Sequence, residues 1–228
     1  PFLVVADADL DAAVEGALLA KFRNIGQACT AANRCIVHTD VADEFARRIT
    51  ERVAALPLGD GQEDGTVIGP LIDDRAVAKA AELVADAAER GATVRTGGRT
   101  VDRDGSFFEA TVVDGVVSGS RILSEEIFGP VLAIARFSTE DEAVALANST
   151  EYGLAAYAYT RDLARAHRLI GRLETGMLGL NAGVISNAAA PFGGVKQSGL
   201  GREGSLEGIQ EYLTTKYSFI PVSTSDTN

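Results

Sequence analysis

The chain has 228 residues, 46% of them hydrophobic, which is enough apolar material for one large globular domain or two small ones. Its formal net charge of −11 comes without a basic block, which argues against nucleic acid or an anionic membrane as the main partner. No apolar run approaches the ~20 residues of a transmembrane helix. The sequence begins abruptly at Pro1 with no basic leader, so we expect a segment of a larger protein.

Short apolar runs alternate with longer stretches of helical periodicity along the whole chain. We expect Asp9 to cap the first helix, Gly91 to close the third, and a Ser138–Asp141 capping box to open the fourth. The alternation predicts an α/β fold with a twisted, mainly parallel sheet flanked by helices. Helices are predicted at 9–22, 41–56, 74–91, 138–150 and 162–174, and strands at 1–5, 34–38, 92–98, 106–116, 129–138, 155–160, 176–181 (a buried strand) and 210–223 (leaving the body).

The stretch "FRNIGQACTAANR", residues 22–34, contains Cys29, one of only two cysteines. Gly26 allows a tight turn before it, and a nucleophilic thiol needs such a partly exposed position near backbone N–H groups. Cys35 lies in a predicted strand and is expected to be a small buried hydrophobe. The residues alone leave Cys29 open between a catalytic and a merely packed cysteine. The pair fits neither a disulfide framework nor a zinc spacing, so we expect no metal site and a reducing, cytoplasmic location.

Two local patterns fail the tests for ligand sites. The acidic run at residues 7–11 lacks the Gly and Glu that a calcium loop needs, so capping is the better interpretation. The sequence "GLGREG", residues 199–204, has no βαβ unit after it, and a Gly-rich loop near a site is expected instead of a dinucleotide fingerprint. His38 and His167 are the only histidines, and both are expected at the surface.

Three segments resemble the aldehyde dehydrogenases, in the order found in that family. They are "FRNIGQACTAANR", "SEEIFGPVLAI" and "NAGVISNAAAPFGGVKQSGLGREGSLEGIQEYLTTKY". The resemblance covers nearly the whole chain as the C-terminal catalytic half of such an enzyme. It implies a catalytic domain at residues 1–212 and an oligomerisation strand and tail at 213–228. It also implies that the N-terminal dinucleotide-binding domain lies outside this chain, and that the protein is a homo-oligomer, either a dimer or a tetramer.

The resemblance implies a mechanism in which Cys29 attacks an aldehyde and hydride leaves for NAD or NADP, giving a thioester that water hydrolyses. Glu126 matches the family residue that holds the nicotinamide ribose, and Phe128 matches the aromatic beside the nicotinamide. Phe192 matches an aromatic of the aldehyde tunnel. Plain core packing remains the alternative for both phenylalanines. The family's catalytic Glu base and second oxyanion donor match no residue here.

Within the family the chain is most similar to succinate-semialdehyde dehydrogenases. Arg23, six residues before Cys29, and Ser186 match the residues that bind the distal carboxylate there. A guanidinium fork suits a carboxylate, and a hydroxyl adds a neutral donor. Succinic and glutaric semialdehyde are therefore the expected substrates, with a structural salt bridge as the alternative role for Arg23.

Other interpretations remain open from the sequence. The aldehyde could be a different one. The chain could be a thiol acyltransferase or hydrolase that uses Cys29 without a nicotinamide, although neither histidine is a plausible partner for the thiol. It could also be a non-catalytic module, inactive without its cofactor-binding half.

Overall fold

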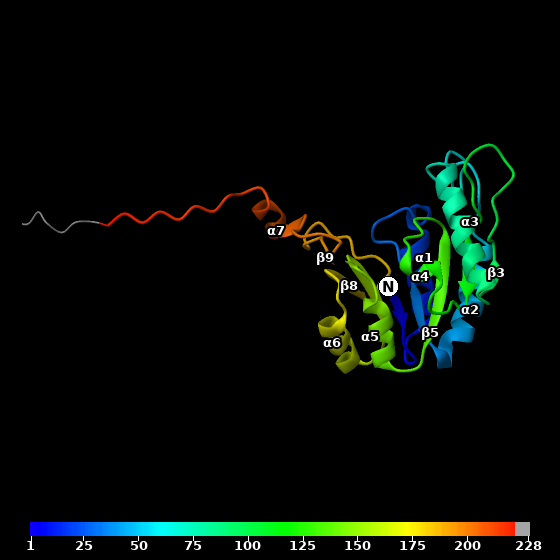
Figure 1. Ribbon diagram of the computed structural model, residues 1–228, viewed down its shortest axis with the longest axis horizontal. Coiled ribbons are helices and arrows are strands. Elements are labelled where there is room, and N and C mark those ends of the chain that lie inside the picture. The colour runs from blue at the N-terminus through cyan, green and yellow to red at the C-terminus, as the bar shows by residue number, and fades with distance from the viewer. Residues whose placement is uncertain (222–228) are drawn as a thin grey trace, which may run out of the picture.

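A seven-stranded sheet of order β3-β4-β5-β2-β1-β7-β8 forms the centre of the computed structural model, which describes residues 1–221 (Figure 1). Every neighbouring pair of strands is parallel except β3 and β4. The predicted α/β class with a mainly parallel sheet is confirmed. The strands are β1 (Phe2–Val4), β2 (Cys35–His38), β3 (Thr93–Thr96), β4 (Thr111–Asp114), β5 (Val131–Phe137), β7 (Ala155–Tyr159) and β8 (Met177–Leu180).

Helices cover both faces of this sheet (Figure 1). On one face, α1 (Leu10–Phe22) and α2 (Thr39–Ala54) pack on a core that includes Phe2 and Cys35. On the other face, α3 (Asp74–Glu89) and α4 (Arg121–Ser124) pack over β4 and β5, while α5 (Glu140–Asn148) and α6 (Leu163–Arg172) pack over a core that includes Leu3 and Ile36. Strands buried on both faces explain the continuous apolar runs in the sequence.

Two of the predicted helix signals are confirmed, and one is wrong by a residue. The Asp9 carboxylate accepts hydrogen bonds from the first turn of α1, and Gly91 follows α3 with a φ of +96°. The N-cap of α5 is Thr139 and not Ser138: its hydroxyl accepts from the N–H of Glu142. The Glu142 carboxylate in turn accepts from the N–H of Ser138, whereas the Asp141 carboxylate accepts from the Arg172 guanidinium.

The chain after β7 differs most from the sequence-based expectation. Strand β8 was predicted to be buried, but only its Gly179 is, because β8 forms the edge of the sheet and pairs with β7 alone. A small antiparallel pair, β6 (Tyr152–Gly153) with β9 (Val195–Lys196), was not predicted. Helix α7 (Ser205–Gln210) was not predicted either, and it overlaps the strand expected at 210–223 at Gln210 alone.

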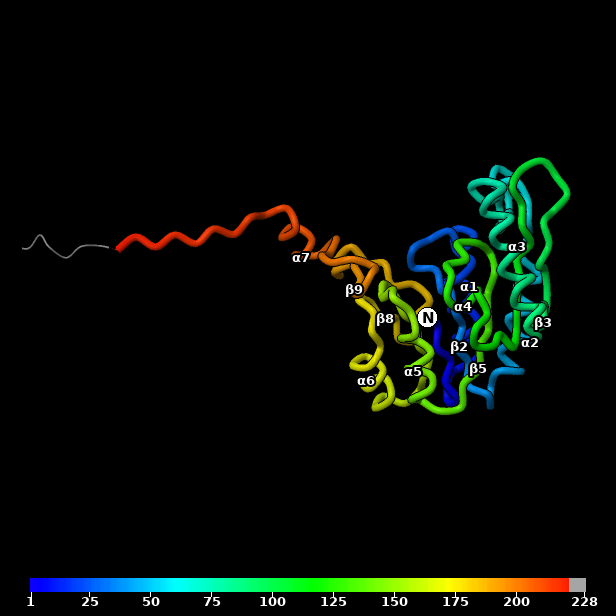
Figure 2. The backbone as a smooth tube through the Cα atoms, in the orientation of Figure 1, coloured from blue at the N-terminus to red at the C-terminus, as the bar shows by residue number. Residues whose placement is uncertain are grey.

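The last described residues, 213–221, run away from the body as an extended, exposed arm (Figure 2). They pair with no strand among residues 1–221, so the expected terminal strand does not form within the described residues. The end of that predicted strand, residues 222–223, lies outside the described residues. Among the helices that the structure describes, none is long and apolar enough to cross a bilayer.

Candidate active site

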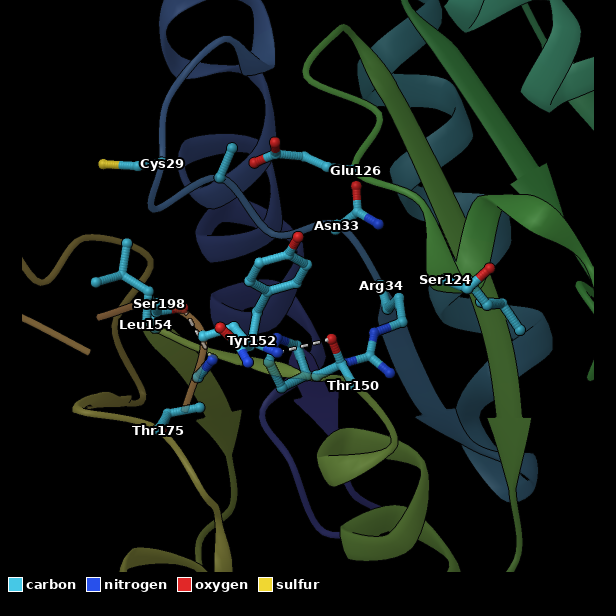
Figure 3. A pocket seen from close by; sticks show the side chains of 16 residues that line it. Cys29, Asn33, Arg34, Ser124, Glu126, Thr150, Tyr152, Leu154, Thr175 and Ser198 are labelled. Carbon is cyan, nitrogen blue, oxygen red and sulfur yellow. Dashed lines mark hydrogen bonds between the residues drawn. The ribbon is translucent and has the colours of Figure 1, made fainter. Parts of the chain in front are cut away.

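Three chain segments meet where parallel strands begin. Residues 27–34 lead into β2, residues 125–130 lead into β5, and residues 150–154 lead into β7. Because the strands are parallel, their amino ends lie at the same edge of the sheet. Cys29, Glu126 and Leu154, one from each segment, line a common cavity of about 340 Å³ (Figure 3).

The turn before Cys29 is held in an unusual backbone conformation. Helix α1 passes into a short 3-10 turn, η1 (Arg23–Gly26), in which Asn24 and Ile25 have φ values of 52° and 61°. The left-handed region is a genuine outlier for a β-branched residue such as Ile25. The Asn24 amide secures the turn by donating to the carbonyl oxygen of Gln27 at 2.7 Å. Local strain of this kind is typical of functional sites.

Gly26 brings the Cys29 segment into backbone contact with the Glu126 segment. Its φ is +76°, and a Cβ at this position would lie 2.3 Å from the carbonyl oxygen of Gly129. Phe128, beside Gly129, is itself left-handed with a φ of 49°. Only a residue without a side chain allows this approach. The nucleophile segment and the cofactor segment predicted from the sequence therefore touch directly.

Cys29 is exposed, while the turn around it is tied to the core. The carbonyl oxygen of Thr30 accepts from the buried Tyr157 hydroxyl at 2.9 Å, and the N–H of Ala32 donates to the carbonyl oxygen of Ala20. Within residues 1–221 the N–H of Cys29 itself donates to no protein atom. Cys35 is only 2% exposed, and burial raises the pKa of its thiol. The two cysteines thus divide into an accessible and an inert one, as predicted.

The carboxylate of Glu126 is exposed and points towards the loop that carries Cys29 (Figure 3). It forms no ion pair or hydrogen bond with any described residue. Lys21, at the end of α1, is 1% exposed, and burial lowers the pKa of its ammonium to about 7, partly opposed by the negative charge of Glu126. Lys21 therefore titrates near neutrality and responds to the charge of Glu126.

Arg23 opens onto a narrow pocket between α1, Tyr157 and the loop at Val184 and Ile185. Its guanidinium is exposed and makes no ion pair or hydrogen bond within residues 1–221, so the salt-bridge alternative is wrong for this part of the chain. Ser186 follows Ile185 and is exposed, but it is not among the residues that line this pocket. The structure thus brings the loop of Ser186 to Arg23 without placing both side chains in one pocket.

The two predicted phenylalanines occupy different surroundings. Phe128 is 40% exposed within residues 1–221. Phe192 is half-buried and lines an open groove of about 860 Å³ together with Cys29. The Gly-rich stretch at 199–204 lines the same groove, as expected for a loop near a site. The cysteine therefore lies between this groove and the cavity that contains Glu126.

Three further residues of the site were missed in the sequence. Tyr157 looked like one more apolar strand residue, and Asn33 like a polar residue before a strand. Lys21 was the best available signal, because it is a charge on a helix that is otherwise mostly apolar. No group of side chains suited to a metal ion occurs among residues 1–221.

The sequence matches the model of the family described as "Aldehyde dehydrogenase family" over residues 1–218. GabD of Escherichia coli, a succinate-semialdehyde dehydrogenase for NADP(+), is 52% identical over 220 residues, which are 96% of this chain and 46% of the relative. A glutarate-semialdehyde dehydrogenase of Pseudomonas putida is 50% identical over 97% of this chain and 46% of its own length. A 3-sulfolactaldehyde dehydrogenase of Pseudomonas putida is 52% identical over 95% and 45%. The chain spans about half the length of the curated relatives it matches.

Solved structures agree with this match. The crystal structure of an E. coli NADP dependent enzyme superimposes with a TM-score of 0.95 at 51% identity, covering 97% of this chain and 46% of that chain. The succinate-semialdehyde dehydrogenase from Burkholderia pseudomallei gives a TM-score of 0.92 at 52% identity, covering 93% and 44%.

Replacing Gly26 by Ala should separate the two segments of the site. The new Cβ meets the Gly129 carbonyl, and its left-handed backbone costs at least about 1–2 kcal/mol of unfolding free energy before the clash is counted. Urea denaturation of the 228-residue chain measures the loss. Gly171→Ala is the matched control, because Gly171 lies in α6 with nothing within 4 Å, and it should be neutral or stabilising by up to about 1 kcal/mol. Equal effects of the two variants would contradict the contact.

Replacing Lys21 by Met should change how stability depends on pH. The unfolded chain keeps the lysine proton up to its ordinary pKa of 10.5, whereas the folded chain releases it near 7. The unfolded state binds more protons between these values, so the wild type gains stability relative to Lys21→Met as pH rises above about 7. Urea unfolding of both proteins at about pH 7 and about pH 9 measures this. The exposed Lys79→Met should show no such trend, and a flat difference for Lys21→Met would refute the assignment.

Proposed function

This chain belongs to the aldehyde dehydrogenase family, and on that premise we propose that it supplies the nucleophile and aldehyde pocket for oxidation of a short carboxylated aldehyde to its acid, with NAD(P)+ as oxidant. The observation that carries the proposal is the exposed Cys29 thiol, which shares one cavity with the unpaired Glu126 carboxylate. Their two segments meet where Gly26 approaches Gly129, and each segment contains left-handed residues at this contact, Asn24 and Ile25 in one and Phe128 in the other.

Cys29 acts as the nucleophile. Its thiolate attacks the aldehyde carbon and forms a thiohemiacetal, whose oxyanion the free N–H of Cys29 stabilises by donating a hydrogen bond. Loss of hydride from that carbon gives a thioester on Cys29, and attack by water releases the acid and restores the thiol. The groove that Cys29 shares with Phe192 gives the aldehyde a way in, on the side away from Glu126.

The residues at the cavity fit a nicotinamide cofactor. Glu126 is an exposed carboxylate without a protein partner, which suits the paired hydroxyls of a ribose, and Phe128 offers an exposed aromatic ring beside it. NAD(P)+, the cofactor class of the family, would supply the hydride acceptor there. We propose that the dinucleotide-binding domain and the base that activates water are contributed by residues outside these 228.

The distal group of the substrate is an anion in this proposal. Arg23 presents an unpaired guanidinium at a small cavity of about 10 Å³ that is also lined by Ala28 and Thr30, the chain neighbours of Cys29, and it suits a carboxylate better than a lysine would. Ser186 lies one residue beyond the pocket lining and offers a second, neutral hydroxyl donor near this cavity. The relatives are named for succinate semialdehyde, glutarate semialdehyde and 3-sulfolactaldehyde, which all carry an anionic group besides the aldehyde. Succinic semialdehyde is our first candidate.

Assembly and location complete the proposal. The arm at 213–221 exposes a series of apolar side chains, which we expect to be covered by a second copy of the chain in a dimer or tetramer; they are Leu213, Tyr217, Phe219 and Ile220. A cytoplasmic location stays a prediction from the cysteine usage.

The reaction itself is tested by joining the chain to its dinucleotide-binding half. The joined protein should form NAD(P)H from succinic semialdehyde, and the 228 residues alone should not. Cys29→Ser should reduce the rate by at least about 10³-fold, because a hydroxyl without a paired base is a poor nucleophile. Cys35→Ser is the control and should retain activity. NAD(P)H formation by the isolated chain, or an active Cys29→Ser protein, would refute the proposal.

The substrate class is tested by Arg23→Met in the same joined protein. The variant should lose about 100-fold in kcat/KM for succinic semialdehyde, since a guanidinium–carboxylate pair is broken, and less than about threefold for uncharged butanal. The exposed Arg99→Met should change neither value. Equal losses for the two aldehydes would show that Arg23 supports the fold and does not read the substrate.

A further inference from the structure

The side-chain amide of Asn33 bonds to the backbone on both sides of Glu126. Its Nδ2 donates to the carbonyl oxygen of Glu125 at 2.9 Å, and its Oδ1 accepts from the N–H of Ile127 at 2.8 Å. One donor and one acceptor thus pair with the residues before and after Glu126, as the backbone of a neighbouring strand would. Figure 3 shows the Asn33 amide lying next to Glu126 in the cavity that both residues line with Cys29.

Few other backbone hydrogen bonds fix this part of the chain, although the side chain of Ile127 is buried in the core. Helix α4 ends at Ser124 and strand β5 begins at Val131, so Glu126 belongs to neither. The N–H of Glu125 still bonds to the carbonyl oxygen of Arg121 at 2.8 Å. Beyond that bond, the backbone of residues 125–128 is hydrogen-bonded only to Asn33 within the described part of the chain. The backbone on both sides of Glu126 is therefore hydrogen-bonded through the Asn33 amide.

We propose that Asn33 is a positioning residue for cofactor binding: it sets Glu126 in the orientation that receives the ribose hydroxyls of the nicotinamide half. This inference rests on the proposed function, in which Glu126 is the cofactor ligand. Asn33 stands four residues after Cys29 in the same loop, so its amide also registers Glu126 against the nucleophile. A displacement of about 1 Å between reacting groups costs an enzyme up to about 100-fold in rate, which is why such registration matters.

Both bonds require an amide at position 33. A carboxylate has only acceptors and would face the Glu125 carbonyl oxygen without a proton to share. A serine hydroxyl is too short to span from one side of Glu126 to the other. The role is therefore specific to Asn, and it adds no charge next to Glu126.

The experiment is a double-mutant cycle in the joined protein, with Asn33→Ala, Glu126→Ala and the double variant. Calorimetry gives the dissociation constants of NAD+ and NADP+ without turnover, and iodoacetamide labelling gives the reactivity of Cys29. Asn148→Ala is the matched control. The Asn148 amide makes the same pair of bonds around Leu173, donating to the carbonyl oxygen of Arg172 at 2.9 Å and accepting from the N–H of Glu174 at 3.0 Å.

Asn33→Ala should weaken binding of the preferred dinucleotide by about tenfold, the effect of losing one net hydrogen bond. In the Glu126→Ala background, the added Asn33→Ala substitution should raise the dissociation constant by less than about twofold, because Asn33 acts through Glu126. Cys29 labelling should stay within about twofold of the wild type, and Asn148→Ala should leave the dissociation constants unchanged.

Additive effects in the cycle, or a change below about twofold for Asn33→Ala alone, would overturn the positioning role. A parallel loss of Cys29 reactivity would also overturn it, by showing that Asn33 supports the nucleophile loop instead. If Glu126→Ala leaves dinucleotide binding intact, the cofactor role proposed for Glu126 has failed and the inference falls with it. If Glu126→Ala weakens dinucleotide binding but Asn33→Ala does not, the positioning role of Asn33 is rejected while the cofactor role of Glu126 stands.

Discussion

The close approach of Gly26 to the Gly129 carbonyl is the constraint on which the rest of the site depends. A side chain at position 26 would hold the two segments apart, and three left-handed residues, Asn24, Ile25 and Phe128, accompany the contact. Such strain persists only where surrounding structure enforces it. Here the enforcement comes from α1 on one side and from strand β5 on the other, so the rigid core keeps the nucleophile segment against the cofactor segment.

The sheet explains why residues far apart in sequence share this site. Strand order places β1 between β2 and β7, and β2 next to β5, so loops that enter these strands converge at one edge. The Tyr157 hydroxyl on β7 reaches the carbonyl of Thr30, and the Asn33 amide reaches the loop before β5. Strand pairing therefore brings the loops to the same edge of the sheet, and a few side-chain hydrogen bonds between the loops fix their relative positions.

The sequence predicts features whose physics is local. Apolar runs, helix periodicity and the caps at Asp9 and Gly91 depend on neighbours within a turn, and the Cys29 and Glu126 segments were found because their residues form long, ordered motifs. The edge position of β8 could not be predicted, since its burial depends on which strands flank it. Tyr157 and Asn33 were missed for the same reason, because their partners lie 127 and 92 residues away.

Charged and polar groups around the sheet differ in whether they have protein partners. Asp114 is buried on β4, between β3 and β5, and is paired with Arg95 and Arg136. The Arg34 guanidinium donates to carbonyl oxygens at the end of α5. By contrast, the Glu126 carboxylate, the Arg23 guanidinium and the N–H of Cys29 are unpaired within residues 1–221. One hydrogen-bond acceptor and two donors are therefore free around the accessible thiol. The side chains of Asn33 and Tyr157, which hold the surrounding loops, have their own hydrogen-bond partners. In the proposed function, these three open groups receive a ligand with hydroxyls at one end, a carbonyl at the thiol and an anion at the other end.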